Sequence, residues 1–150
     1  MATITIIDSG ICNLGSIARS VERAGGEVSV ATRPEQVASA ERLILPGVGS
    51  FPAGMNALNV HGLTVAIREF AATGKPLLGI CLGMQLLFET GEEFEETRGL
   101  GLIPGRVREI AAQGHAIPHM GWNRVDPRRD DALLVGLPDE AYFYFVHSFV

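Results

Sequence analysis

The residues best suited to chemistry form a Gly-x-Cys-x-Gly pattern, Gly79-Ile80-Cys81-Leu82-Gly83. An apolar run, 76–80, leads into the pattern, and a run of helical character, 84–89, leads out. A nucleophile between a strand and a helix, with glycines on both sides, is typical of a nucleophile elbow. The sharp turn lifts the sulfur above the end of the strand, and the positive end of the helix dipole favours its thiolate form. The pattern predicts that Cys81 is a nucleophile for acyl transfer, and a structural cysteine at a tight turn is the alternative.

A second glycine-rich stretch, Pro46-Gly47-Val48-Gly49-Ser50-Phe51, also follows a predicted strand. Glycine adopts both signs of φ, so that a peptide N–H in this stretch can point at a reacting carbonyl oxygen. The stretch therefore predicts an oxyanion-hole loop, with an ordinary strand-ending turn as the alternative.

Other residues of chemical interest lack a complete pattern. Gly10 and Gly15 have phosphate-loop spacing, but no lysine follows them. His115 and His119 are four residues apart like metal ligands on a helix, but Pro118 interrupts such a helix and no further ligand is suitably spaced. Cys12 lies near a predicted helix start, which could lower its pKa, although a small packing residue is the simpler interpretation. We expect neither a cofactor nor a metal.

Alternating strands and helices must position these candidates. The predicted strands are 3–7, 28–31, 42–45 and 77–80, followed by 107–110, 123–125 and 141–146, with a polar turn at 127–131. One helix begins after Asn13 and ends at Gly25-Gly26, a second runs from Pro34 to residue 40, a third ends at Gly74, and 91–97 is an acidic loop. This order predicts an α/β fold with a mostly parallel, doubly wound, flavodoxin-like sheet and helices on both faces. Ligands bind such sheets beyond the carboxyl ends of the strands, where Cys81 lies.

Composition limits the class of protein and its partners. The 150 residues predict a single domain, 1–150, because a chain of this length buries roughly 68–70% of its unfolded surface. A net charge of −5 argues against nucleic acid or an anionic membrane as partner. Neither a signal peptide nor a membrane span is visible, and two cysteines are too few for a disulfide framework. We expect a cytoplasmic protein.

Together the motifs resemble those of the class I, triad-type glutamine amidotransferases. The resemblance rests on residues 46–51 and on Gly79-Ile80-Cys81-Leu82-Gly83-Met84-Gln85-Leu86-Leu87-Phe88-Glu89. Three further stretches, 8–14, 118–123 and 144–149, are similar to the glutaminase subunits of imidazole glycerol phosphate synthases, which serve histidine biosynthesis. Relatives that serve other syntheses usually have a second proline at the position of Val48 and lack the motif around Trp122.

The resemblance implies a reaction and a partner. Cys81 would attack the side-chain amide of glutamine, and water would later hydrolyse the γ-glutamyl thioester. The N–H of Leu82 and an N–H of the 47–49 loop, at Gly47 or Val48, would hold the oxyanion after a peptide flip. The ammonia would pass to a cyclase subunit, a (β/α)₈ barrel, in a heterodimer.

The same resemblance implies the binding residues. Gln85, Glu93 and Ser148 would orient the α-amino and α-carboxylate groups of glutamine. Asn13 and Trp122 would lie at the interface with the cyclase subunit.

One departure from the family pattern concerns the catalytic base. The family's base and its orienting acid lie in a His-Pro-Glu segment downstream of His147, and the present sequence contains no such segment. A cysteine amidase needs a base, so we expect a chain truncated at its C-terminal end and inactive alone. The alternatives are a non-catalytic module that binds glutamine or the synthase, the glutaminase subunit of another synthase, and a different cysteine hydrolase.

Overall fold

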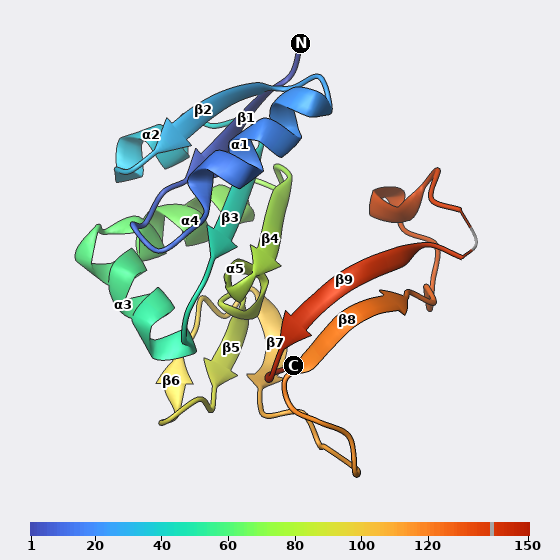
Figure 1. The fold of residues 1–150 in the computed structure, drawn as a ribbon. Helices are drawn as coiled ribbons and strands as arrows, with labels where there is room; N and C mark the ends of the chain where they lie inside the picture. Colours follow the sequence, from blue (N-terminus) through green and yellow to red (C-terminus); the bar gives the residue numbers. More distant parts are fainter. Residues whose placement is uncertain (139) are drawn as a thin grey trace. The chain divides into compact units, whose positions relative to one another are not determined.

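Four parallel strands form the central sheet of the first part of the chain, in the order β2-β1-β3-β4 (Figure 1). The computed structural model describes residues 1–138 and 140–150, and the chain divides into two units, Met1–Arg108 and Glu109–Val150. The elements of this sheet and its helices are β1 Thr3–Ile7, α1 Leu14–Arg23, β2 Glu27–Ala31, α2 Pro34–Ala38, β3 Leu43–Gly47, α3 Phe51–Val60, α4 Leu63–Ala72, β4 Leu77–Cys81 and α5 Leu82–Gln85. The doubly wound parallel sheet is confirmed, whereas the single domain stays a prediction.

The crossover connections distribute the helices over both faces of the sheet. The chain crosses from β1 to β2 in one direction, and from β2 past β1 to β3 and β4 in the other. Since such crossovers are right-handed, α1 lies on one face and α2, α3 and α4 lie on the opposite face. In Figure 1, α1 passes in front of the strands. Both faces of the sheet are therefore covered, as a parallel sheet requires.

Strand residues alternate between two apolar layers. Ile6 and Ile44 pack with Val21 of α1 on one face. The neighbouring residues Ile7 and Leu45 are fully buried on the other face. Helices α2, α3 and α4 contribute the fully buried residues Val37, Phe51, Leu58, Leu63 and Ile67. This double layer holds the carboxyl ends of β3 and β4 in place.

Three predicted helix boundaries are confirmed by the residues that cap them. The Asn13 side chain accepts the Ser16 N–H at 3.2 Å and begins α1. Gly25, at φ 84°, follows the end of this helix, and Gly74, at φ 75°, follows the end of α4. Glycine suits this left-handed position because it has no Cβ.

Two predicted boundaries near the elbow are wrong, and one helix near it was not predicted. Strand β3 continues through Pro46 to Gly47, because its pairing with β1 ends at Ile44 and the proline interrupts no ladder on that side. Helix α3 was not predicted, since its sequence contains Pro52 and Gly54. The elbow helix spans only Leu82–Gln85 rather than 84–89, because the chain turns into another strand.

A second, three-stranded sheet completes the first unit. It contains β5 Phe88–Gly91, β6 Thr97–Arg98 and β7 Ile103–Val107, in the order β6-β5-β7. Strands β5 and β6 are antiparallel, and the mainly acidic segment 92–96 connects them, within the predicted loop. The predicted strand 107–110 is wrong in position, since β7 ends at Val107.

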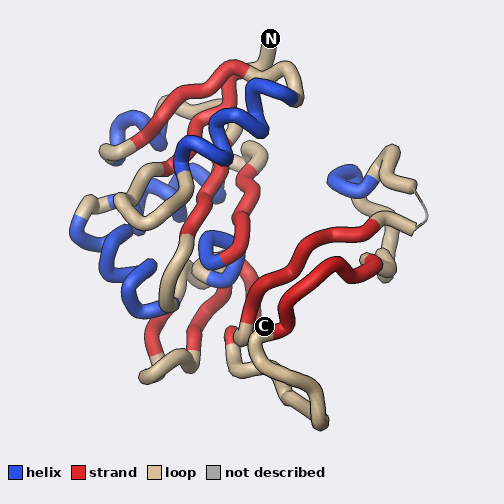
Figure 2. Tube along the Cα trace, viewed as in Figure 1, coloured by secondary structure: helices blue, strands red, loops and turns tan. Residues whose placement is uncertain are grey.

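The second unit is built on an antiparallel pair, β8 His119–Arg124 and β9 Tyr142–His147 (Figure 2). Strand β8 begins before the predicted strand 123–125 and ends one residue earlier. Strand β9 is displaced by one residue from the predicted strand 141–146. The polar turn predicted at 127–131 contains neither helix nor strand, and a short 3-10 helix, Ala132–Leu134, follows it. Among the described residues, no helix has the length and apolar character needed to cross a bilayer.

Candidate active site

Cys81 lies at the tip of a sharp turn between β4 and α5. Its backbone has φ 55° and ψ −123°, and the residue is exposed. A positive φ is strained for a residue with a side chain, and such strain is typical of functional turns. The predicted elbow geometry is therefore present, and the thiol is accessible to a substrate.

The two glycines of the elbow allow the helix to approach the strands closely. A Cβ on Gly79 would lie 2.5 Å from the Met84 Cα, and one on Gly83 would lie 1.8 Å from the Leu45 carbonyl oxygen. Both neighbours are backbone atoms, which cannot move aside without distorting β3 or α5. The Gly-x-Cys-x-Gly pattern is thus explained by packing as well as by the turn.

The predicted oxyanion loop lies directly beside the elbow. Gly47 is the register partner of Cys81 in the β3–β4 pair. A Cβ on Gly47 would lie 3.1 Å from the Gly83 nitrogen and 3.2 Å from the Leu82 Cβ. Gly49 adopts φ 105°, a conformation that favours glycine. The two glycine motifs therefore meet at the carboxyl ends of neighbouring strands.

The amide of Val48 is engaged within the protein. Its N–H donates a hydrogen bond of 2.9 Å to the carbonyl oxygen of Ile11 in the loop after β1. The Val48 side chain is about half exposed. For this amide to hold an oxyanion, the Gly47–Val48 peptide has to rotate and break the bond to Ile11. The sequence offered no signal for the contact with Ile11.

Glu93 reaches the same region from the loop between β5 and β6. Its Oε2 accepts the Phe51 N–H at 2.8 Å, and Phe51 is the first residue of α3 after the oxyanion loop. Gln85 is half-buried at the end of α5, one turn after Cys81. The first unit therefore brings Glu93 to the oxyanion loop, and the contact with Phe51 could not be seen in the sequence.

The other predicted site residues are distributed over both units. Asn13 caps α1 in the first unit, as described above. Ser148 is half-buried after β9, and its carbonyl accepts the Ile110 N–H at 2.9 Å. Trp122 is 68% exposed on β8 and packs edge-to-face on Tyr144, with ring centroids 5.7 Å apart. The roles of Ser148 toward glutamine and of Trp122 toward a partner stay predictions.

Cys12 has a protonated thiol rather than an activated one. Partial burial, followed by the charge and hydrogen bond of Asp8, raises the pKa of Cys12 from 9.0 to about 11. Its Sγ lies 3.7 Å from the Asp8 Oδ1. The alternative of a thiol activated by the helix start is therefore wrong, and Cys12 has no electrostatic advantage as a nucleophile.

His119 pairs with a histidine that sequence reasoning did not connect to it. The two residues are opposite in the β8–β9 register, and the His119 Nδ1 lies 2.8 Å from the His147 Nε2. Asn123 contacts the His119 Nε2, and the Phe149 carbonyl lies 3.1 Å from the His147 Nδ1. Within the described residues, no group of three or more potential metal ligands forms.

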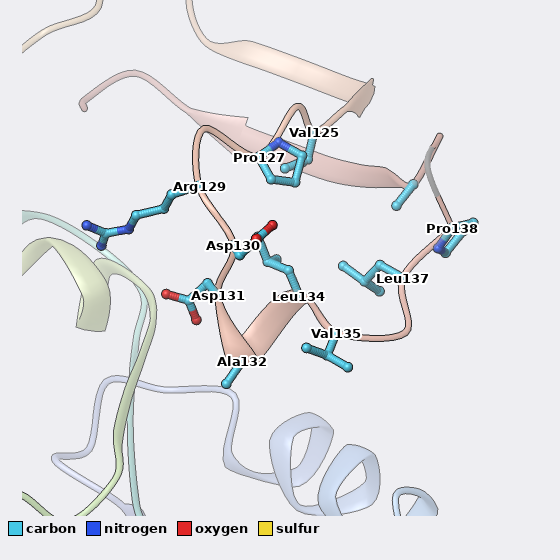
Figure 3. Close-up of a pocket in the computed structure, with 11 residues that line it drawn as sticks. Val125, Pro127, Arg129, Asp130, Asp131, Ala132, Leu134, Val135, Leu137 and Pro138 are labelled. Atoms are coloured by element: carbon cyan, nitrogen blue, oxygen red, sulfur yellow. The ribbon is translucent and has the colours of Figure 1, made fainter.

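A cavity of about 500 Å³ lies in the second unit, between β8 and β9 in sequence (Figure 3). Its lining residues include Arg129, Asp130 and Asp131 together with apolar residues such as Leu134 and Leu137. None of the predicted site residues lines this cavity.

Comparison with known proteins gives the family context. The family "Glutamine amidotransferase class-I" matches residues 5–150. The "Imidazole glycerol phosphate synthase subunit HisH" of one strain of Desulfitobacterium hafniense is 49% identical over 146 residues, which are 97% of this chain and 69% of that relative. The subunits of the same name from Halalkalibacterium halodurans and Moorella thermoacetica are 48% and 49% identical, covering 97% and 99% of this chain and 70% of each relative.

Two solved structures share the fold. A "Crystal structure of glutamine amidotransferase" superposes with a TM-score of 0.60 at 20% identity, over 70% of this chain and 56% of the solved one. A putative peptidase E from Listeria monocytogenes superposes with a TM-score of 0.56 at 15% identity, over 68% and 63% of the two chains. This chain thus spans a little over half of each solved structure, and at such identities the likeness concerns the fold alone.

Proposed function

This chain belongs to the class-I glutamine amidotransferase family, and we propose that it is the glutaminase subunit of an imidazole glycerol phosphate synthase. Its relatives of 46–49% identity carry the name of that subunit. The observation that carries the proposal is the strained, exposed Cys81 at the elbow, next to Gly47 of the oxyanion loop. A cytoplasmic location belongs to the proposal, since both cysteines are free thiols.

The proposed reaction has two covalent steps. The Cys81 thiolate attacks the side-chain amide carbon of glutamine, the C–N bond breaks, and the nitrogen leaves as ammonia after taking up a proton. Water then attacks the γ-glutamyl thioester, which releases glutamate and returns the thiol. The exposure of Cys81 supports this role, because both glutamine and water have to reach the sulfur.

The oxyanion of each tetrahedral intermediate needs backbone donors. We assign the Leu82 N–H at the start of α5 and the Val48 N–H to this task. Val48 donates to Ile11 in this structure, so the Gly47–Val48 peptide has to rotate before the hole is complete. Gly47 and Gly49 on either side of Val48 lower the cost of that rotation.

Binding residues and the partner follow from the same family membership. Gln85, Glu93 and Ser148 are proposed to orient the α-amino and α-carboxylate groups of glutamine. Asn13 and Trp122 are proposed to contact the cyclase barrel, which receives the ammonia. The exposure of Trp122 supports the latter assignment, because exposed tryptophans are enriched at interfaces.

No residue of the 150 is proposed as the base, because no His-Pro-Glu sequence occurs among them. Activity is therefore best measured on two forms. One is the chain as it stands, and the other, called here the extended chain, continues into the His-Pro-Glu segment of a relative.

The proposal is tested by ammonia release from glutamine, measured on both forms with and without the cyclase subunit. The proposal is supported if the cyclase subunit stimulates ammonia release and if Cys81→Ser abolishes this release. Release that persists in Cys81→Ser, or none from either form, would remove the catalytic assignment and leave at most the binding of glutamine or of the synthase.

A further inference from the structure

We propose that Glu93 couples the recognition of glutamine to the oxyanion loop, and that Phe51 is the positioning residue through which it acts. The inference rests on the proposed function, in which Glu93 pairs with the α-ammonium of glutamine. The coupling concerns the other oxygen of the same carboxylate.

The first contact replaces a missing helix cap. Phe51 is the first residue of α3, where the backbone N–H has no partner within the helix. Ser50 occupies the N-cap position but makes no side-chain capping bond. The Glu93 Oε2 accepts the Phe51 N–H at 2.8 Å instead, and its negative charge suits the N-terminal end of the helix. Glu93 therefore fixes the point at which the oxyanion loop ends.

The second contact joins the Phe51 ring to the strands that carry Glu93. The ring is fully buried. A Cβ on Gly91, at the end of β5, would lie 2.4 Å from the ring, and one on Gly99, just after β6, would lie 3.1 Å from it. Both glycines thus make room for this ring, which holds the strands on either side of the Glu93 loop against α3.

A third contact holds the segment just after β6 to α4. The Arg68 Nε donates to the Leu100 carbonyl at 2.8 Å, and its Nη2 donates to the Gly99 carbonyl at 3.0 Å. Because Arg68 holds the segment just after β6 and the end of β5 packs on Phe51, the Glu93 carboxylate has little freedom to move independently of α3. A ligand that orients this carboxylate therefore also orients the end of the oxyanion loop.

The coupling predicts that the hydrogen bond from the Phe51 N–H to Glu93 affects turnover, and that this effect is separate from the effect of the carboxylate charge on glutamine binding. Glu93→Gln keeps an oxygen that can accept the Phe51 N–H but removes the charge that pairs with the ammonium. Glu93→Ala removes both. The matched substrates are glutamine and 4-carbamoylbutanoate, which is glutamine without its α-amino group, assayed with the extended chain and the cyclase subunit.

With glutamine, we expect Glu93→Gln to lower kcat/KM by about 10- to 100-fold, mainly through KM, because a charge-assisted contact is lost. With 4-carbamoylbutanoate there is no ammonium to pair, so the two variants differ only in the acceptor for the Phe51 N–H. We therefore expect the kcat of Glu93→Ala on this substrate to be about 10-fold lower than the kcat of Glu93→Gln. Equal kcat for the two variants on this substrate would overturn the coupling. If the unsubstituted extended chain released no ammonia from glutamine, the proposed function itself would fail.

A second pair of variants isolates the N–H of Phe51. Phe51→Ala and Phe51→Pro both lose the ring, but only Phe51→Pro also loses the N–H, and proline is well accommodated at the first position of a helix. Ser50 already has the extended conformation, ψ 156°, that a residue before proline prefers. We expect kcat of Phe51→Pro to be about 10-fold below that of Phe51→Ala, with similar thermal unfolding. Equal kcat values in the two variants would contradict the role of the N–H.

Discussion

At the scale of single residues, the two cysteines differ because their surroundings differ. Cys81 is exposed at a strained turn between a strand and a helix. Cys12 lies partly buried beside Asp8, whose charge opposes the thiolate and, with burial, raises the pKa of Cys12 to about 11. The chemistry of this chain therefore depends on where each thiol is placed, since both have the same intrinsic reactivity.

The raised pKa of Cys12 predicts how stability changes in alkaline solution. The unfolded thiol ionises near 9.0 and the folded one near 11, so the folded state holds its proton more tightly. This contribution to stability is complete below pH 9 and is lost as the pH rises from 9 to 11. Cys12→Ser should make the free energy of unfolding fall less steeply over that range, measured by urea unfolding at several pH values.

The matched control is Cys81→Ser, which leaves the Cys12–Asp8 pair in place. It should retain the alkaline loss of stability that Cys12→Ser reduces. Identical slopes in the Cys12→Ser variant and the unsubstituted chain would contradict the assigned origin of the raised pKa.

At the scale of elements, the elbow depends on contacts that only glycine allows. A Cβ at Gly83 would lie 1.8 Å from a backbone carbonyl of β3, so α5 and β3 would have to separate. We expect Gly83→Ala to reduce the free energy of unfolding by about 3 kcal/mol or more, since overpacking against backbone is among the most costly substitutions.

Gly15 in α1 is the matched control for this prediction. A Cβ there would meet only the mobile end of Arg19, at 3.2 Å from its Nη1. Alanine in a helix is favoured over glycine by roughly 0.5–1 kcal/mol, so Gly15→Ala should raise stability slightly. Chemical unfolding of both variants tests the pair, and equal stabilities would show that the elbow can relax around a methyl group.

Elements were predictable where local signals and tertiary contacts agreed. The strands 3–7 and 77–80 and the caps at Asn13 and Gly74 follow from apolar runs and from capping residues, and the structure confirms them. Helix α3 escaped prediction because Pro52 and Gly54 indicate a turn, yet Gly54 allows a close approach there, since a Cβ would lie 2.9 Å from a Leu86 methyl carbon. Packing of α3 against α5 thus overrode local preference.

The candidate site was predictable in its motifs but not in its contacts. The sequence indicated Cys81, the oxyanion loop and Glu93 as candidates, and their roles in the reaction stay predictions. The bonds from Val48 to Ile11 and from Phe51 to Glu93 join residues 37 and 42 positions apart. No periodicity or local pattern reports contacts over such distances, so that only the fold reveals them.

At the scale of the whole molecule, the second unit carries two exposed aromatic side chains that lie opposite each other on β8 and β9. Trp122 is 68% exposed, and its strand partner Tyr144 is 55% exposed. Tryptophan and tyrosine are the residues most often responsible for binding energy at interfaces. This exposure fits the proposed interface with a cyclase subunit.

Trp122→Ala should weaken binding of the cyclase subunit by about 2 kcal/mol, or roughly 30-fold in Kd, measured by titration calorimetry with the extended chain. Phe94→Ala is the control, because Phe94 is 89% exposed in the first unit and has no assigned interface role. Equal Kd values for Trp122→Ala and the unsubstituted chain would remove Trp122 from the interface.

The central claim is that the Cys81 sulfur forms a covalent bond to the side-chain carbon of glutamine. The most direct measurement is peptide mass mapping of the extended chain after incubation with an electrophilic glutamine analogue, in the presence of the cyclase subunit. The account predicts a single adduct on the peptide that contains Cys81, lost in Cys81→Ser, suppressed by excess glutamine and unchanged in Cys12→Ser. Labelling of Cys12 instead, or labelling of Cys81 that glutamine does not suppress, would contradict it.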